Sequence, residues 1–190
     1  MKNSLEKFNN LVDAFNALPT VGKKSAMRFA YHLVLKDSYG GMKLAYAIES
    51  AIRNTKKCEL CGGLSEHEVC DICLDDTRDS GILCLVESVK DMLVLEENGA
   101  YEGLYFVLDS LDEEMILKLE KRIEENGVQE IIFALTPGLS SDGIMLFIED
   151  KLSKFDLKFT KIAQGVPTGV NLENVDTLSL SKALQSRTKI

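Results

Sequence analysis

Four cysteines in two C-x-x-C pairs carry the clearest chemical signal in the sequence. Cys58 and Cys61 form the first pair, and Cys70 and Cys73 form the second pair a short loop later. Two such pairs this close together predict one structural zinc ion held by four thiolates, with no ligand position left for a catalytic water. The segment has few large apolar residues. We therefore expect the metal to supply most of its folding free energy, on the order of 10 kcal/mol.

The same spacing leaves other interpretations of the cysteines open. Two disulfides or a thioredoxin-like redox pair are the alternatives. The sequence shows no secretory signal, so we expect a reducing, cytoplasmic environment in which disulfides are rare. The two pairs adjoin each other and not a βα turn, which speaks against a redox pair. A fifth cysteine, Cys84, lies in an apolar run and is expected to be a small buried hydrophobe. His67 lies inside the loop, where we expect a solvated residue rather than a ligand. Gly62 and Gly63 are expected to take positive φ after the first pair.

Charge is distributed unevenly along the chain. Residues 1–57 contain ten Lys and Arg against four Asp and Glu, a net charge of +6, whereas the remainder of the chain, with an overall charge of −8, carries −14. Such asymmetry indicates a nucleic-acid contact confined to one part of the protein, although a basic helical surface without a partner has the same pattern. No apolar run is long enough to cross a bilayer, so we expect no membrane contact.

Residues 1–57 are expected to form three helices. The first covers 4–17 with Ser4 as its N-cap and ends at Leu18-Pro19, because a residue before proline leaves the α region. The second continues to about Lys36, and a break at 37–41 separates it from a third helix at about 42–56. Apolar residues at helical spacing should form the inward faces; these are Leu5, Phe8, Leu11, Val12 and Phe15 in the first helix, and Leu44, Ala45, Ile48 and Ile52 in the third.

The stretch from Leu18 to Arg28 is typical of a helix-hairpin-helix motif. A short turn around Gly22 leads into the start of the second helix, where free backbone N–H groups and the helix dipole favour a phosphate. Lys24 and Arg28 share one helical face, and Lys23 adds charge at the same end. The motif predicts salt-sensitive DNA binding without sequence specificity. The alternative is a plain turn between helices with solvated lysines.

Residues 79–165 have the pattern of a parallel α/β domain. Four apolar runs at 82–86, 104–108, 130–135 and 158–163 alternate with helices that begin at Ser88, at Asp112 and at Ser140 or Ser141. The chain is therefore expected to be an α+β multidomain protein. After this sheet, a turn-rich tail contains a segment at 178–184 that suits either a strand or a short helix.

Three polar residues should gather at the carboxyl edge of this sheet, where parallel sheets place functional groups. They are Glu87 after the first strand, Thr136 after the third strand, and Asp142. A magnesium site needs several carboxylates, and the third strand ends without paired acids. We therefore expect Glu87 to have an electrostatic or interface role rather than a catalytic one.

Taken together, these features resemble the RecR family of bacterial recombination mediators over essentially the whole chain. The most specific segments are the hairpin, the four cysteines, Val86–Asp91, and Ile162 to Pro167. The resemblance implies a helix-hairpin-helix DNA-binding region at 1–57, a zinc finger at 58–78, a Toprim domain without catalysis at 79–165, and a tail at 166–190.

The resemblance also implies a function and partners. Family members assemble into dimers and ring-like tetramers, and they work with RecO, and with RecF, at gapped or single-stranded DNA to help load RecA. The family's DNA-binding residues fall on Lys24 and Arg28, and its Toprim glutamate, in a region linked to RecO contact, falls on Glu87. Two alternatives are a magnesium-dependent Toprim nuclease or primase-like enzyme using Glu87 and Asp142, and a zinc-stabilised adaptor that touches no DNA.

The chain departs from the family pattern in three places. Thr20 stands where the hairpin usually has its first glycine. The loop that the family has after the second strand is absent, since Asp109-Ser110-Leu111 is followed at once by Asp112-Glu113, where the next helix begins. The acidic turn after the third strand is reduced to residues 140–143.

Overall fold

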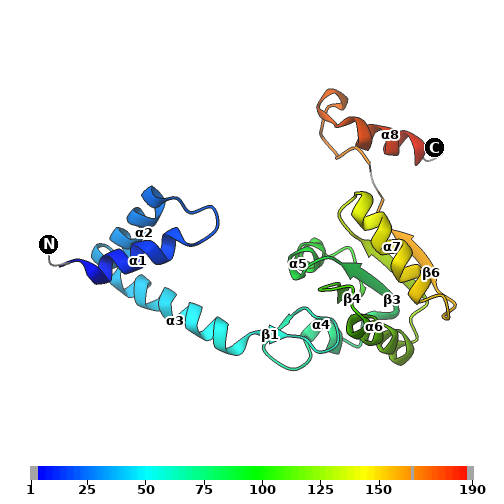
Figure 1. The fold of residues 1–190 in the computed structure, drawn as a ribbon, viewed down its shortest axis with the longest axis horizontal. Coiled ribbons are helices and arrows are strands. Elements are labelled where there is room, and N and C mark those ends of the chain that lie inside the picture. Colours follow the sequence, from blue (N-terminus) through cyan, green and yellow to red (C-terminus); the bar gives the residue numbers. More distant parts are fainter. Residues whose placement is uncertain (1–3, 164, 188–190) are drawn as a thin grey trace. The chain divides into compact units, whose positions relative to one another are not determined.

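A computed structural model describes residues 4–163 and 165–187 (Figure 1). Gln164, which belongs to the segment at 162–167 that resembles the RecR family, lies outside the described residues. The chain divides into a unit formed by Met1–Thr55 and a unit formed by Lys56–Ile190. Each unit is described by itself.

The N-terminal unit consists of α1 (Glu6–Asn16), α2 (Lys23–Leu35) and α3 (Ser38–Asn54). Its buried core is small and contains Val12, Ala26 and Ala30. The partly buried residues packed against this core are Phe8, Leu11, Phe15 and Val21. The predicted apolar stripe of the first helix is therefore confirmed, except that Leu5 is 62% exposed.

Two predicted helix boundaries are wrong. The first helix begins at Glu6 with Leu5 at the N-cap position and no side-chain cap, so Ser4 does not cap it. The break between the second and third helices is shorter than the predicted 37–41, because α2 ends at Leu35 and α3 already begins at Ser38. The Asp37 carboxylate accepts a 2.8 Å hydrogen bond from the backbone N–H of Gly40. This cap stabilises the first turn and offsets the poor helix propensity of the two glycines there.

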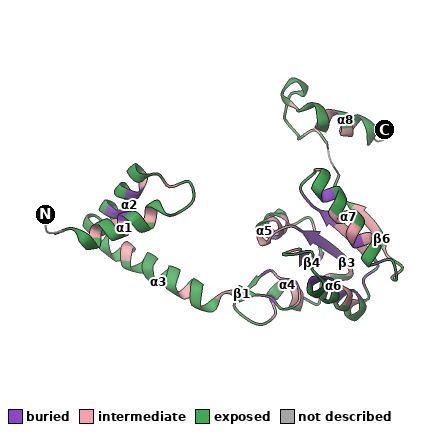
Figure 2. Ribbon diagram, in the orientation of Figure 1, coloured by how far each residue is buried: buried purple, intermediate pink, exposed green. Residues whose placement is uncertain are grey.

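The third helix leaves its apolar residues exposed (Figure 2). Leu44, Ile48 and Ile52 are 42%, 50% and 75% exposed, and α3 contains no buried residue. The expectation that these residues face a core is wrong, because within the described chain no second layer of side chains covers them. The helix ends at Asn54, slightly before its predicted end, and Lys56 and Lys57 form a short strand.

The segment from Cys58 to Cys73, called the metal loop below, follows one short strand and contains a second strand and most of a short helix. Strand β1 (Lys56–Lys57) pairs antiparallel with β2 (Leu64–Ser65), and α4 (Asp71–Leu74) follows. Cys58 and Cys61 therefore lie in the turn of a small hairpin. Cys70 is the N-cap residue of α4, and Cys73 lies inside it.

The predicted parallel sheet is confirmed. Its strands are β3 (Asp79–Val86), β4 (Gly103–Val107), β5 (Glu130–Ala134) and β6 (Lys158–Lys161), in the order β4-β3-β5-β6. The connecting helices are α5 (Val89–Asn98), α6 (Glu113–Asn126) and α7 (Leu139–Lys151). Ser88 and Asp112 cap α5 and α6 as expected, by accepting from the backbone N–H of Asp91 and Met115. Helix α7 begins at Leu139, slightly before the predicted start.

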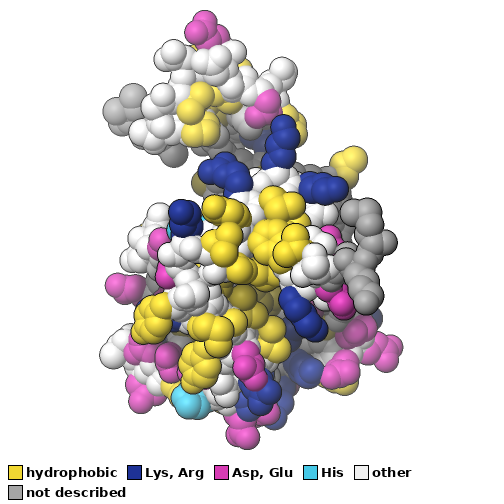
Figure 3. Space-filling view, turned by 90° about the vertical axis from the view of Figure 1, so that its left-hand side faces the viewer, with side chains coloured by type: hydrophobic (Ala, Val, Ile, Leu, Met, Phe, Trp, Pro, Cys, Tyr) yellow, Lys and Arg dark blue, Asp and Glu magenta, His cyan; other side chains and the backbone are white. Residues whose placement is uncertain are grey.

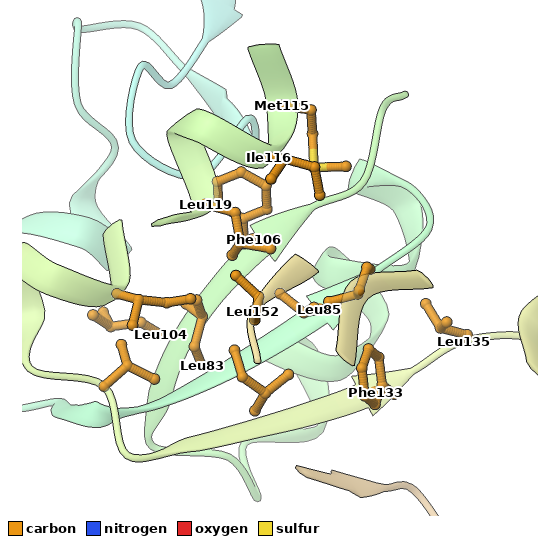
Figure 4. Close-up of a cluster of buried hydrophobic side chains, with 14 residues drawn as sticks. Leu83, Leu85, Leu104, Phe106, Met115, Ile116, Leu119, Phe133, Leu135 and Leu152 are labelled. Atoms are coloured by element: carbon orange, nitrogen blue, oxygen red, sulfur yellow. The ribbon is translucent and has the colours of Figure 1, made fainter. Parts of the chain in front are cut away.

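The two faces of the sheet are covered by different parts of the chain. Leu83 and Leu85 point to the side covered by α6 and α7, and Figure 4 shows this cluster of leucine, phenylalanine and methionine side chains. Cys84 and Val86 alternate with them and point to the opposite side. That side packs against Met92 of α5 and against the cysteines of the metal loop. The metal loop is thus a cover for one face of the sheet.

The tail contains a short 3-10 turn, η1 (Leu172–Asn174), and a helix, α8 (Thr177–Gln185). The segment at 178–184, which suited a strand or a helix, is therefore helical. Asp176 caps it by accepting a 2.9 Å hydrogen bond from the N–H of Ser179. Among the described residues, no helix is both long and apolar enough to span a membrane.

Candidate metal centre and nucleic-acid interface

The four cysteine sulfurs converge on one point. Those of Cys58, Cys61, Cys70 and Cys73 all lie within 4.8 Å of one another, and the sulfurs of Cys61 and Cys70 are 3.6 Å apart. A tetrahedral zinc site with Zn–S bonds of about 2.3 Å requires sulfur–sulfur distances of about 3.8 Å. The donor set therefore fits a structural zinc ion. His67 is exposed and does not belong to the cluster, as expected.

Backbone geometry holds the sulfurs in place. The N–H of Gly63 donates to the sulfur of Cys61, and the N–H of Cys70 donates to that of Cys58, both over 3.3 Å. Gly62 has the expected positive φ of 74°, but Gly63 does not. A glycine is needed at position 63 because there is no room for a side chain: a Cβ atom there would lie 2.7 Å from the terminal methyl of Met92.

The sulfurs compete for protons when no cation is close. The hydrogen bond with Cys70 raises the pKa of the Cys61 thiol, and burial raises it further. The hydrogen bond with Cys61 in turn lowers the pKa of Cys70. A zinc ion removes this conflict, because it favours the thiolate form of every ligand.

A buried arginine contacts the metal cluster. Arg122, on α6, is 5% exposed, and its guanidinium donates a 3.3 Å hydrogen bond to the sulfur of Cys73. Its Nε atom has no hydrogen-bond partner within the described chain. Four thiolates around one zinc ion carry a net charge of −2, and the guanidinium offsets part of that charge. No sequence pattern signals this contact, because the two residues are far apart along the chain.

The metal loop and the parallel sheet share one core. The carbonyl oxygen of Cys61 accepts a 2.8 Å hydrogen bond from the N–H of Val107, at the end of β4. Cys84, 3% exposed, packs in the same cluster as the zinc ligands. Burial raises the pKa of the Cys84 thiol to about 12, which agrees with the small buried hydrophobe expected there. Loss of metal must therefore disturb the sheet as well as the loop.

The predicted phosphate-binding residues lie together at the start of α2. Gly22 is the N-cap residue and has no side chain to satisfy the first N–H groups of the helix. Lys23, Lys24 and Arg28 are all exposed. Thr20, in the turn before the helix, has φ of 66° and is the only described non-glycine residue with positive φ. A β-branched residue thus adopts a strained conformation at the position where the resemblance to the RecR family predicts a glycine.

The acidic edge of the sheet brings together two of the three predicted residues. Glu87 follows β3 and accepts a 2.8 Å hydrogen bond from the hydroxyl of Thr136, which follows β5. Asp142 lies in the first turn of α7 and does not take part in this hydrogen bond. Within residues 4–163 and 165–187, the four cysteines form the only group of three or more His, Cys, Asp or Glu residues close enough to bind one metal ion.

Comparisons with known proteins agree with this architecture. Family models match over four consecutive segments, namely the RecR helix-hairpin-helix at residues 8–52, the RecR four-cysteine zinc finger domain at 55–75, a Toprim domain at 81–163, and the RecR C-terminal segment at 165–188.

Curated relatives match over the full chain. The recombination protein RecR of a Nitratiruptor species is 58% identical over 190 residues, covering all of both chains. That of Campylobacter jejuni subsp. jejuni is 57% identical over the same length. That of Helicobacter pylori is 52% identical over 188 residues, covering 99% of this chain and 97% of the relative. With a helix-hairpin-helix, a zinc finger and a Toprim domain in this order, the chain belongs to the RecR family of recombination proteins.

Proposed function

We propose that this protein is a non-enzymatic DNA clamp and recombination mediator. In this proposal it works with RecO and RecF in recombinational repair to help load RecA at gapped or single-stranded DNA. The observation that carries the proposal is the start of α2, where Lys23, Lys24 and Arg28 are exposed beside an N-terminus without a side-chain cap.

The chemistry of this helix start suits a phosphate. The unpaired N–H groups of the first turn and the positive end of the helix dipole favour an anion. Lys24 and Arg28 lie one turn apart on the same face, so both reach one DNA backbone. These side chains contact phosphates and not bases, so binding without sequence preference is expected.

The acidic edge of the sheet supports a contact with a partner protein rather than catalysis. Glu87 is half-buried, and Thr136 already donates to its carboxylate. No further carboxylate joins them in a metal-binding group within the described chain, whereas magnesium sites generally need more oxygen ligands. Residues 58–190 carry a net charge of −14, which favours a basic partner surface. We assign the contact with RecO to Glu87 on this basis.

Exposed apolar residues on α3 support a homo-oligomer. Tyr39, Met42, Tyr46 and Ile52 are between 73% and 82% exposed. Figure 3 shows hydrophobic side chains exposed together with Lys and Arg on the face that it views. Contiguous apolar surface in a folded protein usually marks an interface. A dimer or a tetrameric ring of this chain would cover it.

DNA binding across a salt series tests the proposal. Fluorescence anisotropy with labelled duplex and single-stranded oligonucleotides compares the unsubstituted protein with a Lys24→Ala, Arg28→Ala double variant. We expect binding that weakens with salt, and for duplex DNA a slope of log K against log salt that falls by about two in the double variant, because each phosphate contact releases about one counterion.

A matched control separates local contacts from net charge. A Lys7→Ala, Lys43→Ala variant removes two charges from α1 and α3 and should bind nearly as the unsubstituted protein does. If both double variants bind alike, the start of α2 is not the phosphate site. If the unsubstituted protein binds no DNA at low salt, the adaptor alternative is favoured. Magnesium-dependent cleavage or synthesis that is lost in Glu87→Ala would favour the enzyme alternative.

A further inference from the structure

The outward face of α2 carries a line of basic side chains beyond the hairpin. Lys24, Arg28, His32 and Lys36 follow one another at intervals of four residues, from the first turn to the C-cap residue. All four side chains are exposed and lie away from the buried side of the helix. Helix α2 contains no Asp or Glu. Residues four apart lie on the same side of a helix. At 1.5 Å per residue, the line extends for about 18 Å along the helix.

Two large side chains lie beside this line and point away from the core. Ala26 and Ala30, both 0% exposed, define the buried side of α2. Met27 and Tyr31 are 42% and 49% exposed. At about 100° per residue, Tyr31 lies next to Arg28 and away from the two alanines. A shallow groove of about 680 Å³ is lined by Met27, Arg28, Phe29, Tyr31, His32 and Lys36.

An exposed aromatic ring among cations is the combination found in single-strand binding sites. Such sites use basic groups to follow the backbone and aromatic rings on which unpaired bases stack, and each stacked base contributes about 1–3 kcal/mol. Duplex DNA keeps its bases stacked in pairs and offers only phosphates to such a surface. Because α2 carries cations and no acidic residue, its charge complements a polyanion better than an ordinary protein surface.

We propose that the outer face of α2 binds single-stranded DNA, with Tyr31 stacking on a base while Arg28, His32 and Lys36 contact the neighbouring phosphates. This inference rests on the proposed function, because the hairpin must first hold the DNA backbone at Lys24. It adds a means of distinguishing single strands from duplexes, which the hairpin alone lacks, since phosphates occur in both.

A tryptophan placed at Tyr31 tests the stacking directly. The chain contains no tryptophan, so Tyr31→Trp in the full-length protein introduces a single reporter. Its emission should be quenched by single-stranded oligothymidylate, through contact with the bases, and much less by a duplex of equal length. Leu117→Trp is the matched control, since Leu117 lies on α6 and is 63% exposed. Its emission should change little with either DNA.

Affinity measurements complete the test. Tyr31→Ala should weaken single-strand binding by about tenfold and leave duplex binding nearly unchanged, whereas Tyr31→Phe should bind as the unsubstituted protein does. The inference is overturned if Tyr31→Ala binds single strands as tightly as the unsubstituted protein does, or if single strands leave the emission of Tyr31→Trp unchanged. If Lys24→Ala, Arg28→Ala loses DNA binding while Tyr31→Ala does not, the proposed function stands and stacking alone fails. If no DNA binds to the unsubstituted protein, both fail.

One further outcome identifies a different occupant. If Tyr31→Ala weakens single-strand and duplex binding equally and also changes the mass of the protein in sedimentation, the face of α2 is a contact between protein copies. That result overturns the stacking inference and assigns Tyr31 to the oligomer interface.

Discussion

The N-terminal helical unit and the C-terminal unit bury their side chains to very different extents. The core of the N-terminal unit consists of Val12, Ala26 and Ala30 with a few partly buried neighbours, and α3 buries nothing. The sheet has fourteen buried residues on one side and nine on the other, the latter including three of the zinc ligands. A small unit with so little core is stabilised weakly by itself. The C-terminal unit has the bound metal as a second source of stability. The N-terminal unit is expected to gain additional stability from contacts with its partners.

Removing the zinc should have the largest effect on the difference in stability between the two units. Because the four cysteines complete the cover on one face of the sheet, loss of about 10 kcal/mol of metal-binding free energy should unfold the loop and loosen β4 and α5. Helices α1 to α3 should keep their protection, since they contribute no ligand. Hydrogen exchange before and after chelation measures both regions in one experiment.

Cys84→Ala provides the control for zinc removal. It truncates a buried side chain of the same cluster without removing a ligand, so the variant should retain one zinc ion per chain. Unchanged protection of β4 after chelation would mean that the loop and the sheet are stabilised independently.

Replacing the buried arginine should have the next largest effect. Arg122→Met removes the N–H donor to the sulfur of Cys73 and leaves the cluster charge without compensation. Loss of such supporting contacts typically lowers metal affinity by about 10–100-fold. Competition with a chromophoric chelator measures the change. Arg53→Met, on the exposed surface of α3, should release zinc as the unsubstituted protein does. Equal zinc affinity in Arg122→Met would show that the contact only fills space.

The smallest predicted effect concerns the N-terminal unit. Thr20→Gly relieves a left-handed backbone that costs a non-glycine residue about 1–2 kcal/mol. Added freedom in the unfolded chain offsets part of this gain, so the unit should become more stable by about 1 kcal/mol or less. Hydrogen exchange in α1 and α2 measures it. Thr55→Gly is the control, since Thr55 is extended and should gain nothing. A loss of stability in Thr20→Gly would mean that the threonine side chain contributes more than the strain costs.

Local patterns in the sequence predicted most of the C-terminal unit. Buried parallel strands read as apolar runs, and the caps at Ser88 and Asp112 mark helix starts through their own hydrogen bonds. The proximity of Glu87 and Thr136 followed from the rule that parallel strands end at one edge. The metal site was predictable because its spacing is local.

The parts that failed depend on contacts that spacing does not encode. A glycine pair at residues 40 and 41 suggested a break, but the cap at Asp37 decides the start of α3. The apolar spacing of α3 predicted a buried face, but periodicity shows only that a face is apolar and not whether this chain covers it. The contact of Arg122 with Cys73 joins two segments that meet only after the sheet has formed.

The hydrogen bond between the carbonyl of Cys61 and the N–H of Val107 also bears on the order in which the chain folds during synthesis. The ribosome completes all four cysteines before it reaches β3, so a zinc ion can close the loop while the sheet is still being translated. Domains generally fold from the N-terminal side as they emerge. The closed loop then offers a fixed acceptor where β4 ends. Metal supply at the moment of translation would therefore determine how much of the newly made chain reaches its native state.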